Sequence, residues 1–350
     1  YSYTIVHCDA DWYPSGLSVE EYMSGFAHQA IHDYSLSFNT YVNYVHYRLK
    51  LPNEDVKILI SGNYVIKVFE DFDENKLILV RRFSVSESLA SITGNASRPV
   101  MDPYRDDGHQ VSFKVYLGSL SIYDPYSEIK VAIQQNNRWN MCIRTLKPLF
   151  VRENELDYNY QSENIFKAGN EYRYFDIKSM RYMAEMVQNI EYKAPHHHVY
   201  LYPDHPRNNG RYFYREDLNG RFFIEVQEGV NRDTESDYVH VHFTLPLEFP
   251  IVDGYLYVSG SLNNWEYNEI NRMEYNFDKK AYELNLLLKQ GYYNYEYVHI
   301  RENSRFPDAT YLEGSYYETE NDYVVYVYLA TNTSRYDRLI AYQILNSIRK

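Results

Sequence analysis

Hydrophobic and polar positions alternate most regularly between residues 255 and 300. The string YLYVSGSLNNWEYN is followed, after a spacer, by LNLLLKQGYYNYEYVHI. This pattern predicts a strand, a turn rich in Gly and Asn, a second strand, a Gly turn and a third strand. Because side chains of a strand alternate between its faces, Tyr293, Tyr295 and Tyr297 are expected to share one face. The opposite, half-wet face would carry Tyr292, Asn294, Glu296 and Val298.

Similar alternation recurs along the chain and predicts an all-β protein with minor helix. A short helix is expected after Ser18, a suitable N-cap with Glu21 three residues on. The stretch 61–87 is expected to form a hairpin that turns at Asp73–Asn75. The segment RLIAYQIL fits both the strand and the helix period, so its type stays open. Further strands are expected at residues 1–8, 38–49, 110–117, 129–135, 140–146, 171–177, 199–202, 222–226 and 237–243.

The length of 350 residues favours two or three domains. We expect tandem Ig-like or early-set β-sandwich domains, the first an Ig-like β-sandwich over residues 1–88. Because the chain begins directly with an alternating strand at Tyr1, we expect an upstream segment and the first strand or strands of this domain to be missing. A second β-sandwich is expected over 89–228, and an early-set Ig-like domain over 229–350.

Tyrosine dominates the composition, with 41 residues against 14 Gly and 12 Pro. Tyrosine has a high strand propensity and keeps its hydroxyl in water while its ring packs, which supports the β prediction. The charge balance is 35 basic minus 48 acidic residues, or −13. This balance argues against nucleic acid or an anionic membrane as the partner. No apolar run reaches the length that a membrane-spanning helix needs.

Residues with possible metal or catalytic chemistry do not form a recognised motif. His196, His197, His198 and His205 lie together in PHHHVYLYPDHP, but adjacent side chains point in different directions, so a solvated loop explains them better than a metal site. Asn219–Gly220 is typical of a hairpin turn. No nucleophile elbow, phosphate loop or dinucleotide fingerprint occurs. We therefore expect no catalytic, cofactor-binding or metal-binding residues, and a protein that is not an enzyme.

The two cysteines, Cys8 and Cys142, leave two alternatives open. They could form one disulfide in an oxidising compartment, or remain as two free thiols.

Trp265 is the most distinctive single candidate for binding. Its surroundings, VSGSLNNWEYN and LLLKQGYYNYEYV, resemble the early-set Ig-like glycogen-binding modules. In that family the Trp after the Asn pair stacks on sugar rings, helped by a basic residue on the following strand and a second Trp. Here Glu296 stands nearest to the basic position, and no Trp follows Trp265. A glycan-binding module centred on Trp265 is therefore the alternative function. The aromatic contact surface would comprise Trp265, Tyr292, Tyr293 and Tyr295.

A second resemblance extends over nearly the whole chain, from residue 1 to about residue 342. The chain is similar to the type IX secretion system plug protein family of Bacteroidota. The matching stretches are YSYTIVHCDADWYPSGLSVEEYMSGF, FNTYVNYVHYRLKLPN, ISGNYVIKVF, RRFSV, QQNNRWN, GNEYRYFD, DLNGRFFIEV, LLLKQGYYNYEYV, TENDYVVYVY and RYDRLIAY.

The resemblance implies a non-enzymatic periplasmic protein associated with the outer membrane. Its partner would be the β-barrel translocon of the type IX system, whose periplasmic opening it would seal when cargo is absent. No cofactor is implied. A specific seal needs a complementary surface, commonly above about 1,000 Å². Exposed Tyr and Trp suit such a surface because they combine contact area with tolerance of water.

Overall fold

The structure, a computed structural model, describes residues 1–160, 162–304, 306–331 and 334–348. It is mostly β, with several antiparallel sheets and a few short helices, which confirms the all-β expectation at that level. The parallel pair β18–β20 is the exception to the antiparallel pairing in the part described. The Ig-like or early-set β-sandwich type stays a prediction.

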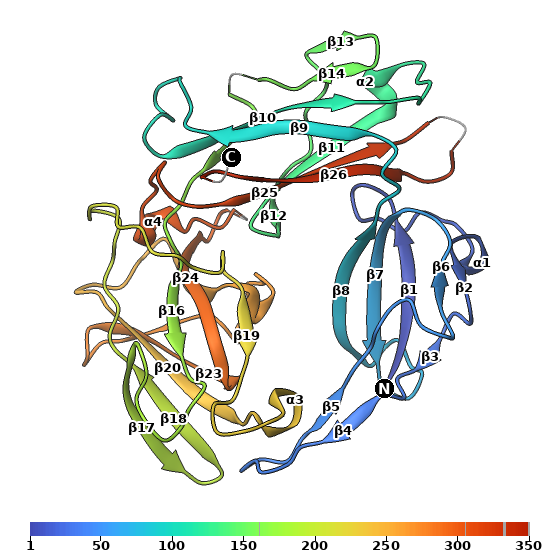
Figure 1. Ribbon diagram of the computed structural model, residues 1–350. Helices are drawn as coiled ribbons and strands as arrows, with labels where there is room; N and C mark the ends of the chain where they lie inside the picture. The colour runs from blue at the N-terminus through green and yellow to red at the C-terminus, as the bar shows by residue number, and fades with distance from the viewer. Residues whose placement is uncertain (161, 305, 332–333, 349–350) are drawn as a thin grey trace.

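The strands fall into three groups by hydrogen bonding and packing (Figure 1). The N-terminal group holds a four-stranded sheet and two small two-stranded sheets. Its elements are β1 (Ser2–Cys8), α1 (Val19–Tyr22), β2 (Met23–Ser24), β3 (Gln29–Ala30), β4 (Tyr34–Leu36), β5 (Val45–Tyr47), β6 (Lys57–Ile58), β7 (Gly62–Phe69) and β8 (Leu77–Val85).

The middle group combines the next strands with the last two of the chain. Its elements are β9 (Ser91–Ser97), β10 (Gly108–Tyr116), α2 (Pro125–Glu128), β11 (Ile129–Gln135), β12 (Arg138–Ile143), β13 (Phe150–Arg152), β14 (Glu155–Asp157), β15 (Ile165–Lys167), β25 (Asp322–Leu329) and β26 (Arg338–Asn346). Here β25 pairs with β11 over seven residues, with Val131 opposite Val327. Side chains from both sheets of this group share one core, with Val111, Ile133 and Tyr323 among its buried members.

The inserted group lies between β15 and β25 in the sequence. Its elements are β16 (Arg173–Asp176), β17 (Val187–Lys193), β18 (His196–Leu201), β19 (Phe222–Ile224), α3 (Arg232–Glu235), β20 (Tyr238–Pro246), β21 (Gly254–Ser259), η1 (Ser261–Asn263), β22 (Glu274–Asn276), β23 (Ala281–Lys289), β24 (Gly291–Arg301) and α4 (Thr310–Glu313). These elements enclose a second core, which runs from Phe175 to Leu312.

The expected boundary between residues 228 and 229 falls inside the inserted group. β19 lies before it and β20 after it, and both join sheets that pack on the same core. The expected unit 229–350 is likewise split, because β25 and β26 pair with β11 of the middle group. Alternation indicates that a segment is a strand but not which strand it pairs with. The pairing of β11 with β25, across nearly two hundred residues, was therefore not predicted from the sequence. Independent folding of 1–88, 89–228 and 229–350 stays a prediction.

Several local expectations can be compared directly with the structure. The hairpin expected over 61–87 is present as β7 and β8, and Ser18 and Glu21 form the expected capping box at α1. The segment RLIAYQIL, for which the sequence left strand and helix both open, forms part of strand β26. The long strand expected over 38–49 is wrong: only Val45–Tyr47 is strand, and it pairs with β4. Ser37 and Tyr44 hold the intervening segment as a loop through the bond from the Tyr44 amide to Ser37 Oγ at 3.0 Å.

The three groups contact one another pairwise and form a closed arrangement. In Figure 1 the middle group spans the top, and the other two lie below it on opposite sides. Tyr328 of the middle group donates to Asn63 Oδ1 of the N-terminal group at 3.0 Å. Arg138 of the middle group pairs with Glu296 of the inserted group at 2.5 Å.

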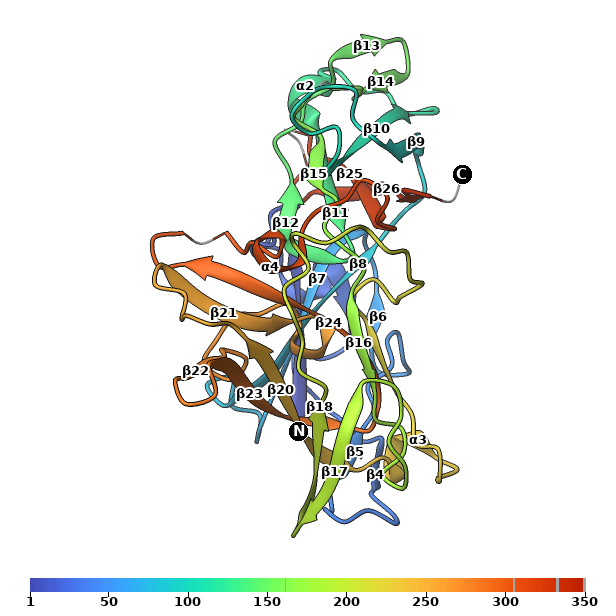
Figure 2. The same cartoon turned by 90° about the vertical axis from the view of Figure 1, so that its left-hand side faces the viewer.

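The third contact is made by the arm, residues 34–47, which reaches from the N-terminal group to α3 and β20. The Tyr44 hydroxyl donates to the carbonyl of Ser236 at 2.8 Å, and the Tyr41 amide donates to Asp237 Oδ1 at 2.8 Å. Figure 2, turned by 90°, also places β4 and β5 near α3. Each group therefore contacts both of the others, and these contacts restrict hinge motion between any two groups.

Candidate functional site

The four expected aromatic contact residues differ in exposure. Tyr293 and Tyr295 are 2% and 1% exposed and lie in the core of the inserted group, so a partner docked on the folded surface does not reach them. The expected half-wet face of this strand is wrong, since Asn294, Glu296 and Val298 are buried as well. The reason is that other segments cover this face: Arg138 of the middle group pairs with Glu296, and the Leu218 amide donates to Asn294 Oδ1 at 2.5 Å. Trp265 and Tyr292 keep accessible surface, and their contact role stays a prediction.

Trp265 belongs to a cleft between the three groups, with a volume of about 720 Å³. Residues from β8, from β12 and from the turn after η1 line it, together with the last two strands. All three tryptophans of the chain, Trp12, Trp139 and Trp265, are among its lining residues. Sequence reasoning missed Trp12 and Trp139, because they lie far from Trp265 in the chain and only the closed arrangement brings them together.

Close packing holds the tryptophans in the cleft wall. Trp12 meets Trp139 edge to face, with ring centroids 4.8 Å apart. The Arg82 guanidinium lies 4.8 Å from the Trp12 ring centroid, a cation–π geometry. Trp265 packs on Gly220, whose φ is +77°, and a Cβ there would lie 3.2 Å from Trp265 Cζ2. The Asn219–Gly220 turn is therefore present, although β18 and β19 on either side of it do not pair as a hairpin.

The cleft has buried hydrogen-bond donors without acceptors. The side-chain nitrogens Trp12 Nε1, Gln134 Nε2, Arg138 Nε and Trp265 Nε1 are buried and have no partner in the part of the chain that the structure describes. Buried polar groups are nearly always paired, so a cluster of unpaired donors is unusual. Ser86 Oγ, which can donate or accept, is also buried without a partner among the described residues that line the cleft, whereas the four nitrogens only donate, so the main lack is of acceptors.

Charge in the cleft is predominantly positive despite the net charge of −13. Arg81 and Arg82 line it and have no ion-pair partner among the described residues. Burial lowers the pKa of Arg82, and the nearby Arg144 adds to that effect. Arg138, which is 8% exposed, is paired with Glu296. Glu266 is the acidic residue at the rim, where it accepts from Asn264 Nδ2 at 3.2 Å.

The histidines at 196–198 lie in strand β18, which corrects the expected solvated loop. Alternation places His196 and His198 on one face and His197 on the other, as anticipated from their adjacency. His198 stacks on both His240 and His242 of β20, and its Nδ1 is 2.9 Å from His242 Nε2. Burial and the neighbouring imidazoles lower the pKa of His242 to about 4. Among the described residues, no group of three or more His, Cys, Asp or Glu has a geometry that could hold a metal ion.

A buried ion-pair network lies beneath the surface of the inserted group. Arg173 donates to Glu313 Oε1 at 2.9 Å and to Asp204 Oδ1 at 2.7 Å. Tyr295 and Tyr297 both donate to Asp204 Oδ2, at 2.6 and 2.8 Å. Arg207 pairs with Glu313 at 2.7 Å.

The pairing in this network offsets the burial of its charges. Burial opposes ionisation of Glu313, but Arg173 and Arg207 hold the pKa of this carboxyl below its usual range. Every charge of the network is matched, so removal of one member would leave a buried charge without its partner, and the network suggests no chemistry with a ligand.

Cys8 and Cys142 are both free thiols in this structure. Burial raises the pKa of Cys8 to about 11, with the nearby Asp9 acting in the same direction. Such a thiol is a poor nucleophile at neutral pH.

Comparison with known proteins adds two findings. Residues 1–87 match the family model described as type 9 secretion system plug protein 1st domain. A crystal structure of a hypothetical protein from Parabacteroides merdae is similar over 99% of this chain and 87% of that chain, with 39% sequence identity and a TM-score of 0.95. No curated protein sequence matches the chain. A search of the described residues for a helix both long and apolar enough to traverse a membrane finds none.

Proposed function

We propose that this chain, which belongs to the type 9 secretion system plug protein family, seals the periplasmic opening of the type IX outer-membrane translocon when cargo is absent. It would do so as a non-enzymatic protein of the periplasm, associated with the outer membrane through the translocon barrel. The single observation that carries the proposal is the family match over residues 1–87.

The closed arrangement of the three groups supports a sealing role. A pore wide enough for folded cargo can be blocked sterically only by a body that keeps its shape against the opening. The arm closes the arrangement with polar bonds and with ring contacts, such as Tyr44 against Tyr238 at 5.3 Å. We further propose that the groups are Ig-like or early-set β-sandwiches, one of them inserted in another instead of following it in tandem, since each surrounds its own core.

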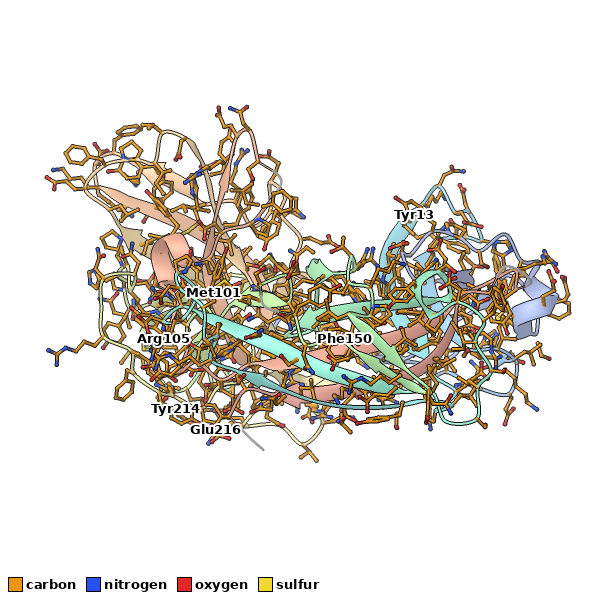
Figure 3. All side chains as sticks on the ribbon, turned by 90° about the horizontal axis from the view of Figure 1, so that it is seen from above. Tyr13, Met101, Arg105, Phe150, Tyr214 and Glu216 are labelled. Carbon is orange, nitrogen blue, oxygen red and sulfur yellow. The ribbon has the colours of Figure 1, made fainter. Side chains whose placement is uncertain are left out.

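Exposed aromatic side chains give the body surfaces that suit a protein partner. Phe26 and Phe38 of the N-terminal group are 80% and 65% exposed. Figure 3 shows Tyr13 at one end of the molecule, while Tyr214 lies near the other end. Trp265 and Tyr292 remain candidates for contact with the translocon. Aromatic residues contribute strongly to interfaces because they bury much area at a small entropic cost.

Deletion of the gene in cells with an intact translocon tests the sealing role. We expect uptake of a large antibiotic to rise, and to return to the original level when the chain is supplied in trans. A strain that also lacks the translocon barrel is the matched control, and there the deletion should have no effect. Unchanged uptake in the single deletion would contradict sealing.

The alternative function is glycan binding centred on Trp265, which the position of this residue in a tryptophan-lined cleft favours. Isothermal titration calorimetry with α-glucans separates the two functions. A plug should give no heat of binding, whereas a glycan-binding module should give saturable heat that Trp265→Ala abolishes.

A further inference from the structure

Strand β8 forms one edge of the four-stranded sheet β3-β1-β7-β8. One side of β8 pairs with β7 along its length, and no strand in the described part of the chain pairs with the other side. In an antiparallel strand, half of the backbone N–H and C=O groups point to each side. The free side therefore presents backbone donors and acceptors to the space between the groups, where Figure 1 shows β8 facing β16 and β19. One of these acceptors, the Val80 carbonyl, accepts from Arg81 Nη1 at 2.8 Å, a bond that an added strand would have to replace.

The side chains of β8 make this edge unusual. Leu77, Ile78, Leu79 and Val80 are all exposed, from 38% to 55%. Natural proteins usually protect a long apolar edge with proline, inward charges or a covering element, because such an edge pairs readily with other chains. The first half of β8 contains none of these devices. An exposed apolar edge of this kind promotes aggregation unless another segment covers it.

The second half of β8 is basic and enters the tryptophan cleft. Arg81 and Arg82 follow Val80 directly, and residues from Val80 to Ser84 line the cleft. Neither arginine has an ion-pair partner among the described residues, and the unpaired donors of the cleft wall lie nearby. The edge thus combines free backbone groups, an apolar half and a cationic half in one continuous strand.

We propose that the free edge of β8 binds an extended peptide segment, which adds to the sheet as a further strand. Backbone hydrogen bonds along β8 would provide the affinity, and side-chain contacts the selectivity. The chemistry of the edge fits a partner with apolar side chains opposite Leu77–Val80 and acidic side chains opposite Arg81 and Arg82. This binding site is separate from the sealing role and does not rest on it.

A blocked synthetic peptide of sequence Glu-Glu-Thr-Val-Thr-Val-Thr-Val is a suitable probe for antiparallel addition. Because all three tryptophans line the cleft, intrinsic fluorescence reports on its occupation. We expect a saturable fluorescence change, with binding weakened at least about tenfold when Lys-Lys replaces Glu-Glu. A peptide with two valines replaced by proline should not bind, since proline cannot donate to the ladder.

Two pairs of protein variants locate the binding. Ile78→Lys should abolish binding, whereas Leu287→Lys, at a similarly exposed position on β23, should not. Arg81→Glu should weaken binding about tenfold or more, while Arg211→Glu, which changes the net charge equally in an exposed loop, should leave it unchanged. Circular dichroism spectra that match the unmodified protein establish that each variant is folded.

Several results would overturn the proposal. One is a flat titration with the Glu-Glu peptide at millimolar concentration. Another is equal binding of the Lys-Lys or proline-containing peptide, because strand addition with charge selectivity forbids both. A third is a stable dimer of the unliganded protein that Ile78→Lys converts to a monomer, since a second copy would then occupy the edge.

Discussion

The ion-pair network of the inserted group and the tryptophan cleft both combine arginine with aromatic rings, but they differ in how completely their polar groups are paired. In the network, Arg173 is matched by Asp204 and Glu313, and two tyrosine hydroxyls satisfy Asp204. In the cleft, Arg82 lies against the Trp12 ring, and several buried donors have no hydrogen-bond partner within the described ranges.

This difference in pairing distinguishes a region that holds the fold together from a region that is able to bind a ligand. A fully paired buried network gains nothing from a ligand, because each group already has its partner. Unpaired donors in the wall of a cleft gain from a ligand that supplies acceptors once the wall side chains shift to admit it, since these nitrogens are buried. Residue type alone would rank the two regions equally, so completeness of pairing is the more useful criterion for function here.

The largest effect is expected from breaking the network. Asp204→Ala leaves the Arg173 guanidinium partly unmatched and removes the acceptor of Tyr295 and Tyr297. We expect a loss of about 3–5 kcal/mol in the free energy of unfolding, measured by urea denaturation. Glu185→Ala is the control, because its pair with Arg215 at 2.9 Å is exposed and should contribute less than about 1 kcal/mol. Equal losses in both variants would refute the contrast.

A smaller, pH-dependent effect is expected at Glu171, next to the network. Burial raises the pKa of this carboxyl to about 7, although the Tyr212 hydroxyl donates to its Oε1 at 2.5 Å. Its Oε2 is buried and has no hydrogen-bond partner in the portion of the chain that is described, which favours the neutral, protonated carboxyl. A raised pKa means that the folded state binds the proton more tightly, so this stabilisation is present below pH 4.5 and is lost as the pH rises through about 7.

Glu171→Gln should remove that pH dependence. We expect the free energy of unfolding of the unmodified protein to fall by roughly 1–2 kcal/mol more than that of the variant between pH 4.5 and 7.5, after allowance for solvent screening. Urea denaturation at a series of pH values measures the difference. Parallel curves for the two proteins would show that Glu171 is not buried in this way.

The smallest effect on stability is expected from Trp265→Phe in the cleft. The indole nitrogen of Trp265 has no partner among the described residues, so its removal forfeits no hydrogen bond. We expect a change below about 1 kcal/mol in the free energy of unfolding, because most of the apolar ring contact is kept. Thermal denaturation with calorimetry provides the value. A loss above about 3 kcal/mol would indicate that Trp265 serves the core, like Tyr293.

The sequence predicts the strands of this molecule better than their partners. Alternation located β1, β7, β8 and β24, because the strand period is a local property. It did not reveal that β24 is buried on both faces, since Glu296 reads as a polar position but is matched by Arg138 from another group. It named Trp265 as a candidate, but Trp12 and Trp139 join that site only through long-range packing.

The most direct test of the central claim is purification of the tagged chain from outer membranes in mild detergent. The account predicts that the type IX translocon barrel co-purifies in a nearly equal molar amount, and that the two proteins elute in one peak on size-exclusion chromatography. Recovery of the folded chain from these membranes without the barrel would contradict the account.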